Sequence, residues 1–195
     1  MLRQRGGRPT RFTATERFAV ERIGFVWEAR FRVAPLVAID VADGYRDGRG
    51  FLQVRPLGIP TRARAGPGIA LGEIYRYLAE LPWVPHAMTA NPRLQWTGAG
   101  DRQVNVTTAA LDRRPPVTLE FDAHGDIVSC STPARPRQVG RVYANTAWGG
   151  GFSRYATLDG MRIPTHAEVY WDLPGGRFVY WRARVLSAQM LAESL

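Results

Sequence analysis

Apolar and polar side chains alternate along several stretches of the chain, and this alternation predicts strands. The clearest stretch covers residues 23–33, where every second side chain is apolar and three of those side chains are aromatic. A period of two is typical of a strand that buries one face. The strands predicted in this way span residues 23–33, 36–41, 51–57, 94–97, 104–111, 117–121, 127–131, 152–158, 167–173 and 178–185.

Two segments carry helix signals instead. Residues 68–81 place six apolar side chains at i, i+3 and i+4 spacing, and Pro82 ends the pattern. The segment Thr13–Glu16 has the spacing of a capping box, which predicts a short helix that ends near Arg22. The helix over 68–81 is the one good helix in the middle of the chain, so it is expected to cover the apolar face of the strands.

Short turns separate most of the predicted strands, as at Asp47-Gly48 and Asp159-Gly160. Such connections favour antiparallel neighbours, because parallel strands need long crossovers. The predicted fold is therefore α+β, with a large antiparallel β-meander that curls around one or two helices. In the last hairpin, a pairing of residues 173 and 177 would place Trp171 opposite Val179 and Val169 opposite Trp181.

Length favours a single domain, because 195 residues suffice to bury a substantial core. We expect residues 12–186 to form that domain, after a disordered, Arg/Gly-rich segment at residues 1–11 and before a tail at residues 187–195. No apolar stretch follows Met1 and no run approaches a membrane span, so no signal peptide, no transmembrane segment and a cytoplasmic location are expected.

All 26 basic residues are arginines, which excludes chemistry that depends on a lysine, such as Schiff-base catalysis. The net charge is +9, and residues 1–64 hold 13 arginines against six acidic residues. Such an excess can attract nucleic acid, but no nucleic-acid-binding motif accompanies it, so a nucleic-acid partner is not expected. Cys130 is the only cysteine, which excludes an intrachain disulfide and a thiolate metal cluster.

The residues with candidate acid–base chemistry lie on the predicted helix. Glu73, Arg76 and Glu80 are three and four positions apart, so they share one helix face. Three interpretations stay open: a solvated helix face, a structural clamp in which Arg76 anchors the helix to the sheet, and a buried set that tunes a general acid. The histidines are isolated in sequence, and no nucleophile or metal motif is present, so no metal and no cofactor are expected.

Aromatic side chains are the most suggestive set, because a curled sheet with a helix could enclose an apolar pocket. The alternative is that they form an ordinary core. The candidate ligand-binding residues are Trp27, Arg76, Trp83, Trp148, Trp171 and Trp181.

The motif Glu73-Ile74-x-Arg76-Tyr77-Leu78-Ala79-Glu80-x-Pro82-Trp83-x-Pro85 resembles a family of uncharacterised bacterial proteins, a domain-of-unknown-function family. Stretches around residues 24–30, 43–50, 148–150, 160–165 and 180–182 add to the resemblance, which covers roughly residues 12–185. His86 stands where the family usually has Thr. The resemblance implies no known activity, and the architecture that it implies looks like the lipoprotein-carrier half-barrel, in which a curled sheet holds helices against an apolar concave face.

These features favour non-enzymatic binding of an apolar or amphipathic small molecule, such as a lipid, in a half-barrel cavity. Arg76, Arg137 or Arg62 would then hold an acidic head group. One alternative is a small hydrolase or isomerase that uses Glu73 and Glu80, with weaker candidates in Asp47 and His86. Another alternative is a structural or protein-interaction module. The oligomeric state is left open by the sequence.

Overall fold

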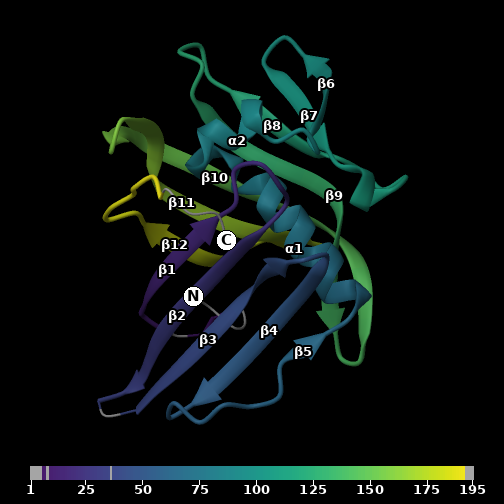
Figure 1. Ribbon diagram of the computed structural model, residues 1–195. Helices are drawn as coiled ribbons and strands as arrows, with labels where there is room; N and C mark the ends of the chain where they lie inside the picture. Colours follow the sequence, from purple (N-terminus) through teal and green to yellow (C-terminus); the bar gives the residue numbers. More distant parts are fainter. Residues whose placement is uncertain (1–5, 8, 36, 192–195) are drawn as a thin grey trace.

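The computed structural model describes residues 6–7, 9–35 and 37–191, and it contains two antiparallel sheets with helices between them (Figure 1). The N-terminal sheet has the order β1-β2-β3-β4-β5 and comprises β1 (Phe12–Phe18), β2 (Phe25–Ala34), β3 (Val37–Arg46), β4 (Arg49–Pro56) and β5 (Arg64–Ala65). The C-terminal sheet has the order β12-β11-β10-β9-β8-β7-β6 and comprises β6 (Gln95–Gly100), β7 (Gln103–Thr107), β8 (Val117–Phe121), β9 (Ile127–Val139), β10 (Val142–Leu158), β11 (Met161–Leu173) and β12 (Gly176–Arg184). The helices are α1 (Pro67–Ala79) and α2 (Pro85–Ala90), and single 3-10 turns lie at η1 (Leu81–Trp83) and η2 (Ala109–Leu111).

The predicted antiparallel α+β class is confirmed, because each strand pairs with its sequence neighbours in both sheets. The alternating segment 23–33 forms β2, and the predicted helix over 68–81 forms α1. Asp47 and Gly48 join β3 to β4 with φ angles of 52° and 78°, which is the left-handed backbone expected of this turn.

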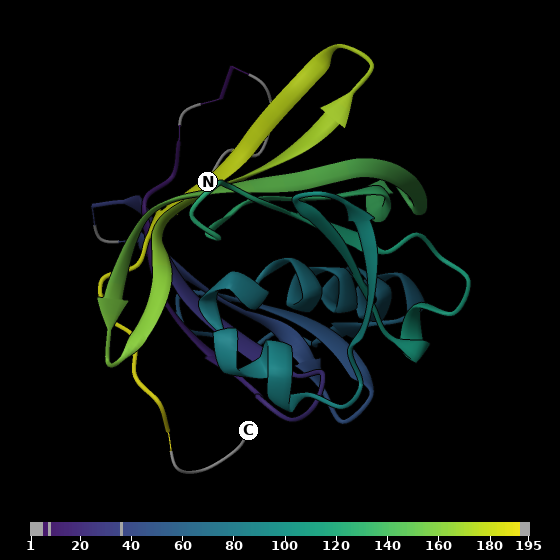
Figure 2. The same cartoon turned by 90° about the horizontal axis from the view of Figure 1, so that it is seen from above.

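The sequence predicted one large curled sheet, but the strands form two separate sheets. Neither sheet closes on itself (Figure 2). The reason lies in α1, which is buried along Gly72–Tyr75 and again along Tyr77–Ala79, and hence on nearly all sides. A helix of this kind needs cover from two directions. The chain therefore completes a first meander, passes through α1 and builds a second meander on the helix's other side.

Three local predictions were wrong. The strand predicted over residues 104–111 ends at Thr107, and Ala109–Leu111 forms a 3-10 turn. Residues 12–18 form strand β1 rather than a capped helix, because their backbone pairs in register with β2. In the last hairpin Val169 lies opposite Trp181 as predicted, but an irregularity after Val169 shifts the register, so Trp171 pairs with Phe178 rather than with Val179. The structure also adds α2, which was not predicted, and extends β9 and β10 into a long hairpin.

The hairpin registers decide which side chains the N-terminal sheet turns towards α1. Glu16 on β1 and Asp43 on β3 both pair with Trp27 on β2, and partners directly opposite share one face of a sheet. Gly50 on β4 is where the helix approaches most closely, because a Cβ there would lie 2.7 Å from the backbone nitrogen of Ala70. The sheet thus presents two carboxyls and a tryptophan to the helix.

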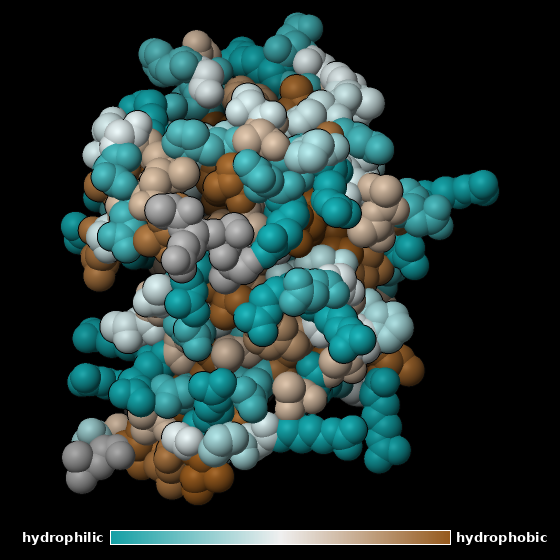
Figure 3. All heavy atoms as spheres, in the orientation of Figure 1, coloured by the Kyte–Doolittle hydropathy of each residue, from teal (hydrophilic) through white to brown (hydrophobic). Residues whose placement is uncertain are grey.

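Exposed hydrophobic side chains gather where β2 ends, β3 begins and β4 ends, at the lower end of the molecule in the space-filling view (Figure 3). They include Val33, Val37, Leu57 and Ile59. Neither helix in the described part of the chain has the length and apolar character needed to cross a membrane.

Candidate functional site

A cavity of about 330 Å³ lies between the inner face of the N-terminal sheet, α1 and strands β9–β12. Its walls are largely apolar and aromatic, and one end is charged. The N-terminal sheet contributes Trp27, Phe31, Ile39, Val41, Leu52 and Val54, and the C-terminal sheet contributes Trp148, Val169, Tyr180 and Trp181. The charged residues at the cavity are Asp43, Glu73, Arg76, Glu80 and Arg135.

The charged end is organised around the guanidinium of Arg76, whose side chain is only 14% exposed. Nε donates to Glu80 Oε1 at 2.7 Å, Nη1 donates to Asp43 Oδ1 at 2.8 Å and Nη2 donates to Glu16 Oε1 at 2.8 Å. A fourth carboxylate oxygen, Oε2 of Glu73, lies 4.0 Å from Nη1. Each of the three guanidinium nitrogens therefore donates to a carboxylate on a different residue.

The same guanidinium packs on aromatic rings of β2. Its carbon lies 4.8 Å from the ring centroid of Phe25 and 5.2 Å from that of Trp27. Cation–π contacts of this kind favour the charged guanidinium at a largely buried position. Of the three interpretations of the helix face, the solvated face is excluded, and the clamp is what the contacts form: Arg76 joins α1 to β1, β2 and β3.

Burial and crowding shift the protonation of the carboxyls. Burial, followed by the charge of Asp43, raises the pKa of Glu73 to about 8. Burial, followed by the charge of Glu80, raises the pKa of Glu16 well above its usual value. Burial also raises the pKa of Glu80, although Arg76 opposes the shift. Near neutral pH the cluster therefore holds protons.

A second guanidinium borders the cavity from β9. Arg135 Nε donates to the carbonyl oxygen of Gly72 on α1 at 3.2 Å, and its guanidinium carbon lies 4.2 Å from the ring centroid of Trp148. Trp148 Nε1 in turn donates to the hydroxyl of Tyr180 at 3.1 Å. These contacts join α1 to the C-terminal sheet along the wall of the cavity.

The structure brings most of the sequence-predicted site residues together, but not all. Those that line the cavity are Trp27, Glu73, Arg76, Glu80, Trp148 and Trp181. Trp83 does not line it, because its Nε1 donates to the carbonyl oxygen of Pro164 at 2.9 Å and its ring packs edge-on against Phe152. Trp171 stacks on Tyr180 behind the wall, and His86 is exposed on α2.

Several residues of the cavity or its charged end were not predicted as site residues, among them Glu16, Asp43, Arg135 and Tyr180. Glu16 and Asp43 carry no local signal, since their role depends on both lying opposite Trp27 across two hairpins. Tyr180 alternates with Phe178 along a predicted strand, and that periodicity was a signal for a buried face.

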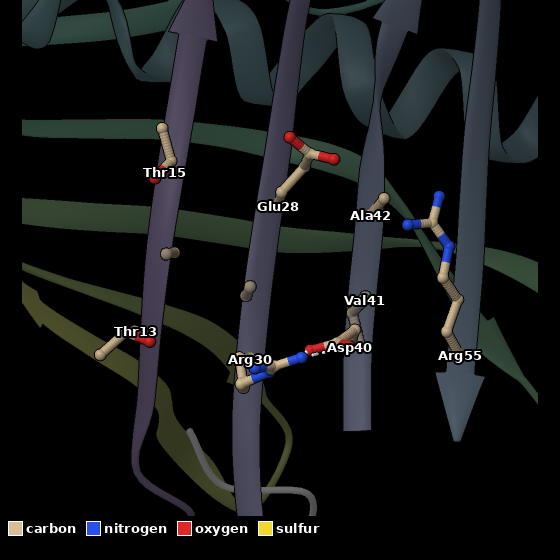
Figure 4. Close-up of a pocket in the computed structure, with 10 residues that line it drawn as sticks. Thr13, Thr15, Glu28, Arg30, Asp40, Val41, Ala42 and Arg55 are labelled. Carbon is tan, nitrogen blue, oxygen red and sulfur yellow. Dashed lines mark hydrogen bonds and ion pairs between the residues drawn. The ribbon is translucent and has the colours of Figure 1, made fainter. Parts of the chain in front are cut away.

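A second hollow, of about 400 Å³, lies on the outer face of the N-terminal sheet (Figure 4). The side chains drawn there come from β1 to β4, and Arg30 forms an ion pair with Asp40 at 2.7 Å. The Arg30 side chain is 63% exposed, so this hollow is an ordinary solvated sheet surface. Among the residues that the structure describes, no group of three or more His, Cys, Asp or Glu side chains is arranged to hold a metal ion.

Comparisons with known proteins bear on the family rather than on the activity. No curated protein and no solved structure shows significant similarity to the chain, so the half-barrel likeness has no support from a solved fold. One family model matches residues 1–183, which is nearly the whole chain. The chain therefore belongs to DUF6544, a family of unknown function.

Proposed function

We propose that this protein binds an amphipathic small molecule in the cavity between its two sheets, without chemical turnover. The observation that carries the proposal is the cavity itself, with rigid aromatic and aliphatic walls and one charged end. Its volume of about 330 Å³ falls within the range of known small-molecule sites. Burial of the ligand's apolar part would supply affinity, at roughly 25 cal/mol per Å².

The sequence suggested that Arg76, Arg137 or Arg62 holds an acidic head group, but the contacts of these residues do not favour that arrangement. All three guanidinium nitrogens of Arg76 already donate to carboxylates. Arg62 is exposed, and neither Arg62 nor Arg137 lines the cavity. The ligand's polar end must instead suit an end that is rich in carboxyls.

Calorimetric titration with octan-1-ol tests the binding function, because this probe has an apolar chain and an uncharged polar end. We expect saturable binding to the wild type and binding weaker by roughly tenfold or more in Val169→Trp, whose larger side chain fills the cavity. Val139→Trp is the matched control, since Val139 is 44% exposed at the end of β9, away from the cavity lining. Equal affinities in all three proteins would place any binding elsewhere and contradict the proposal.

A second candidate function is supported by Glu73 alone. A carboxyl with a pKa of about 8 exchanges a proton near neutral pH, and Glu73 borders an apolar cavity, so it meets the requirements of a general acid or base. A hydrolase would cleave p-nitrophenyl butyrate, and an isomerase would convert a β,γ-unsaturated ketone to its conjugated form. This candidate would be favoured if the wild type turned over one of these substrates and Glu73→Gln lost that turnover while still binding octan-1-ol. If the wild type turned over neither substrate, the binding function would remain as the proposal.

A further inference from the structure

Carboxyls outnumber guanidiniums at the charged end of the cavity. If all were ionised, four carboxylates would face two guanidiniums, for a local charge of two negative units. These groups are Glu16, Asp43, Glu73, Glu80, Arg76 and Arg135. This is the opposite sign to the +9 of the whole chain. An excess of buried negative charge must be neutralised by protons or by a cation.

Two buried carboxylate oxygens in this cluster have no hydrogen-bond partner, one on Glu73 and one on Glu80. Glu73 is only 9% exposed, and its Oε2 is buried and accepts no hydrogen bond. The Oε2 atom of Glu80 has no partner either, but the other oxygen of that carboxyl accepts from Arg76 Nε at 2.7 Å. The nearest guanidinium nitrogen to Glu73 Oε2 is 4.0 Å away, and a buried acceptor without a donor is unfavourable, so Glu73 is the position where a bound molecule gains most by offering a donor.

Neither neighbouring guanidinium donates a hydrogen bond to Glu73 Oε2 in the structure. Arg76 is 4.0 Å from Glu73 Oε2 and is committed to three other carboxylates. Arg135 donates to the carbonyl oxygen of Gly72 and packs its flat face against Trp148. Trp27 and Trp148 line the cavity from its two walls, and each already packs against a guanidinium, Arg76 at Trp27 and Arg135 at Trp148.

We infer that the ligand carries a protonated amine at its polar end, which donates to Glu73, and an apolar chain or ring that fills the space between the sheets. This inference rests on the proposed binding function and names its ligand class. An ammonium supplies both the missing donor and the missing positive charge, and hydrogen bonds between charged groups are stronger than those between neutral ones. A carboxylate ligand would add a fifth acid to the cluster.

The inference has a pH signature. Glu73 is faced by Asp43 from β3, by Arg76 and Glu80 from its own helix and by Arg135 from β9, while Glu16 from β1 completes the cluster. Because Glu73 is largely protonated below about pH 8, binding of an ammonium must displace its proton. Amine affinity should therefore rise roughly tenfold for each pH unit up to about pH 8, and about one proton should be released per ligand bound.

Three probes of equal chain length separate the outcomes: octylamine, octan-1-ol and octanoate, titrated by calorimetry at about pH 6, 7 and 8. We expect octylamine to bind at least roughly tenfold more tightly than octanoate at about pH 8, and only octylamine to gain affinity as the pH rises. In Glu73→Gln, which keeps the side-chain shape, we expect octylamine to lose both its advantage over octanoate and its gain in affinity with rising pH. Buffers of different ionisation enthalpy report the released proton directly.

Failure of the amine inference and failure of the proposed binding function would give different results in these titrations. Octan-1-ol or octanoate binding that equals or exceeds octylamine binding would overturn the amine inference and leave the binding function intact. Binding of none of the three probes would overturn both. An octylamine preference that persists unchanged in Glu73→Gln would also overturn the assignment, because the preference would then come from another group.

Discussion

The guanidinium of Arg76 joins three strands to a helix, and its removal should lower the free energy of unfolding. Without it, the carboxyls of Glu16, Asp43 and Glu80 would lose their donor at a largely buried position. Loss of one partner from a buried ion pair typically costs about 3–5 kcal/mol. We therefore expect Arg76→Met to lower the free energy of unfolding by about that amount, as measured by urea denaturation at about pH 7.

The loss should shrink at about pH 5, because protonated carboxyls need no counter-charge. Arg30→Met is the matched control, since the Arg30–Asp40 pair lies on the solvated outer face of the same sheet and its removal should change stability little. An Arg76→Met variant as stable as the control at both pH values would show that the cluster does not hold the helix to the sheet.

Glu73 makes stability depend on pH in the opposite direction to an ordinary surface acid. Its folded pKa of about 8 lies above the usual value of 4.5, so the folded state binds the proton more tightly than the unfolded chain does. The contribution of Glu73 to the unfolding free energy should therefore be highest below about pH 4.5 and should fall as the pH rises to about 8. Glu73→Gln should make this fall shallower and should raise the melting temperature most at about pH 8, as followed by circular dichroism. Parallel curves for the two proteins would contradict the assignment.

At the scale of elements, the packing of α1 against β4 depends on the absence of one side chain. A Cβ at Gly50 would lie 2.7 Å from the backbone nitrogen of Ala70, which cannot move without the helix. Gly50→Ala should thus lower the unfolding free energy by about 1–3 kcal/mol. Gly72→Ala is the matched comparison on the helix itself, where a Cβ meets no atom within 4 Å and the better helix former should add up to about 1 kcal/mol. Urea denaturation should show shifts of opposite sign.

The elements that the sequence revealed are those whose pattern matches their burial. In β2 the aromatic residues alternate with charged ones and lie inward as predicted, so the strand is visible from its own residues. In β1 the inward position 16 is occupied by Glu16, which interrupts the apolar alternation. Together with Thr13 it has the spacing of a capping box, and this spacing wrongly indicated a helix. Its partner, Arg76, is 60 residues away, and no local rule connects the two.

The members of the charged cluster that lie on one helix could be predicted from the sequence, and those on separate strands could not. The i, i+3 and i+4 spacing of Glu73, Arg76 and Glu80 placed three cluster members on one helix face from sequence alone. The remaining two acids required the register of two hairpins. The cross-strand partner of Trp171 was predicted wrongly for a related reason. The irregularity after Val169 shifts the pairing by one residue, and no turn residue near Val169 indicates that shift.

At the scale of the whole molecule, α1 is the element that the two sheets share. The hydroxyl of Tyr77 donates to the carbonyl oxygen of Ala19, just after β1, at 2.9 Å. The hydroxyl of Tyr75 donates to the carbonyl oxygen of Pro115, just before β8, at 2.9 Å. Two tyrosines that are two positions apart on α1 thus bond to backbone next to each of the two sheets, and the sheets lie on opposite sides of the helix (Figure 2).

Neither meander can bury its apolar face without that helix, so the two sheets should unfold together despite sharing no strand pairing. We expect hydrogen exchange, followed by mass spectrometry at increasing urea, to give the same opening free energy for peptides from β2 and from β10. Peptides from the exposed edge strand β6 should exchange at lower free energy, because an edge strand frays locally. If β10 stayed protected at urea concentrations where β2 exchanges fully, each sheet would be stable on its own, and the cavity would be a boundary between two independent units. A single shared transition would instead mean that any molecule bound between the sheets stabilises both of them at once.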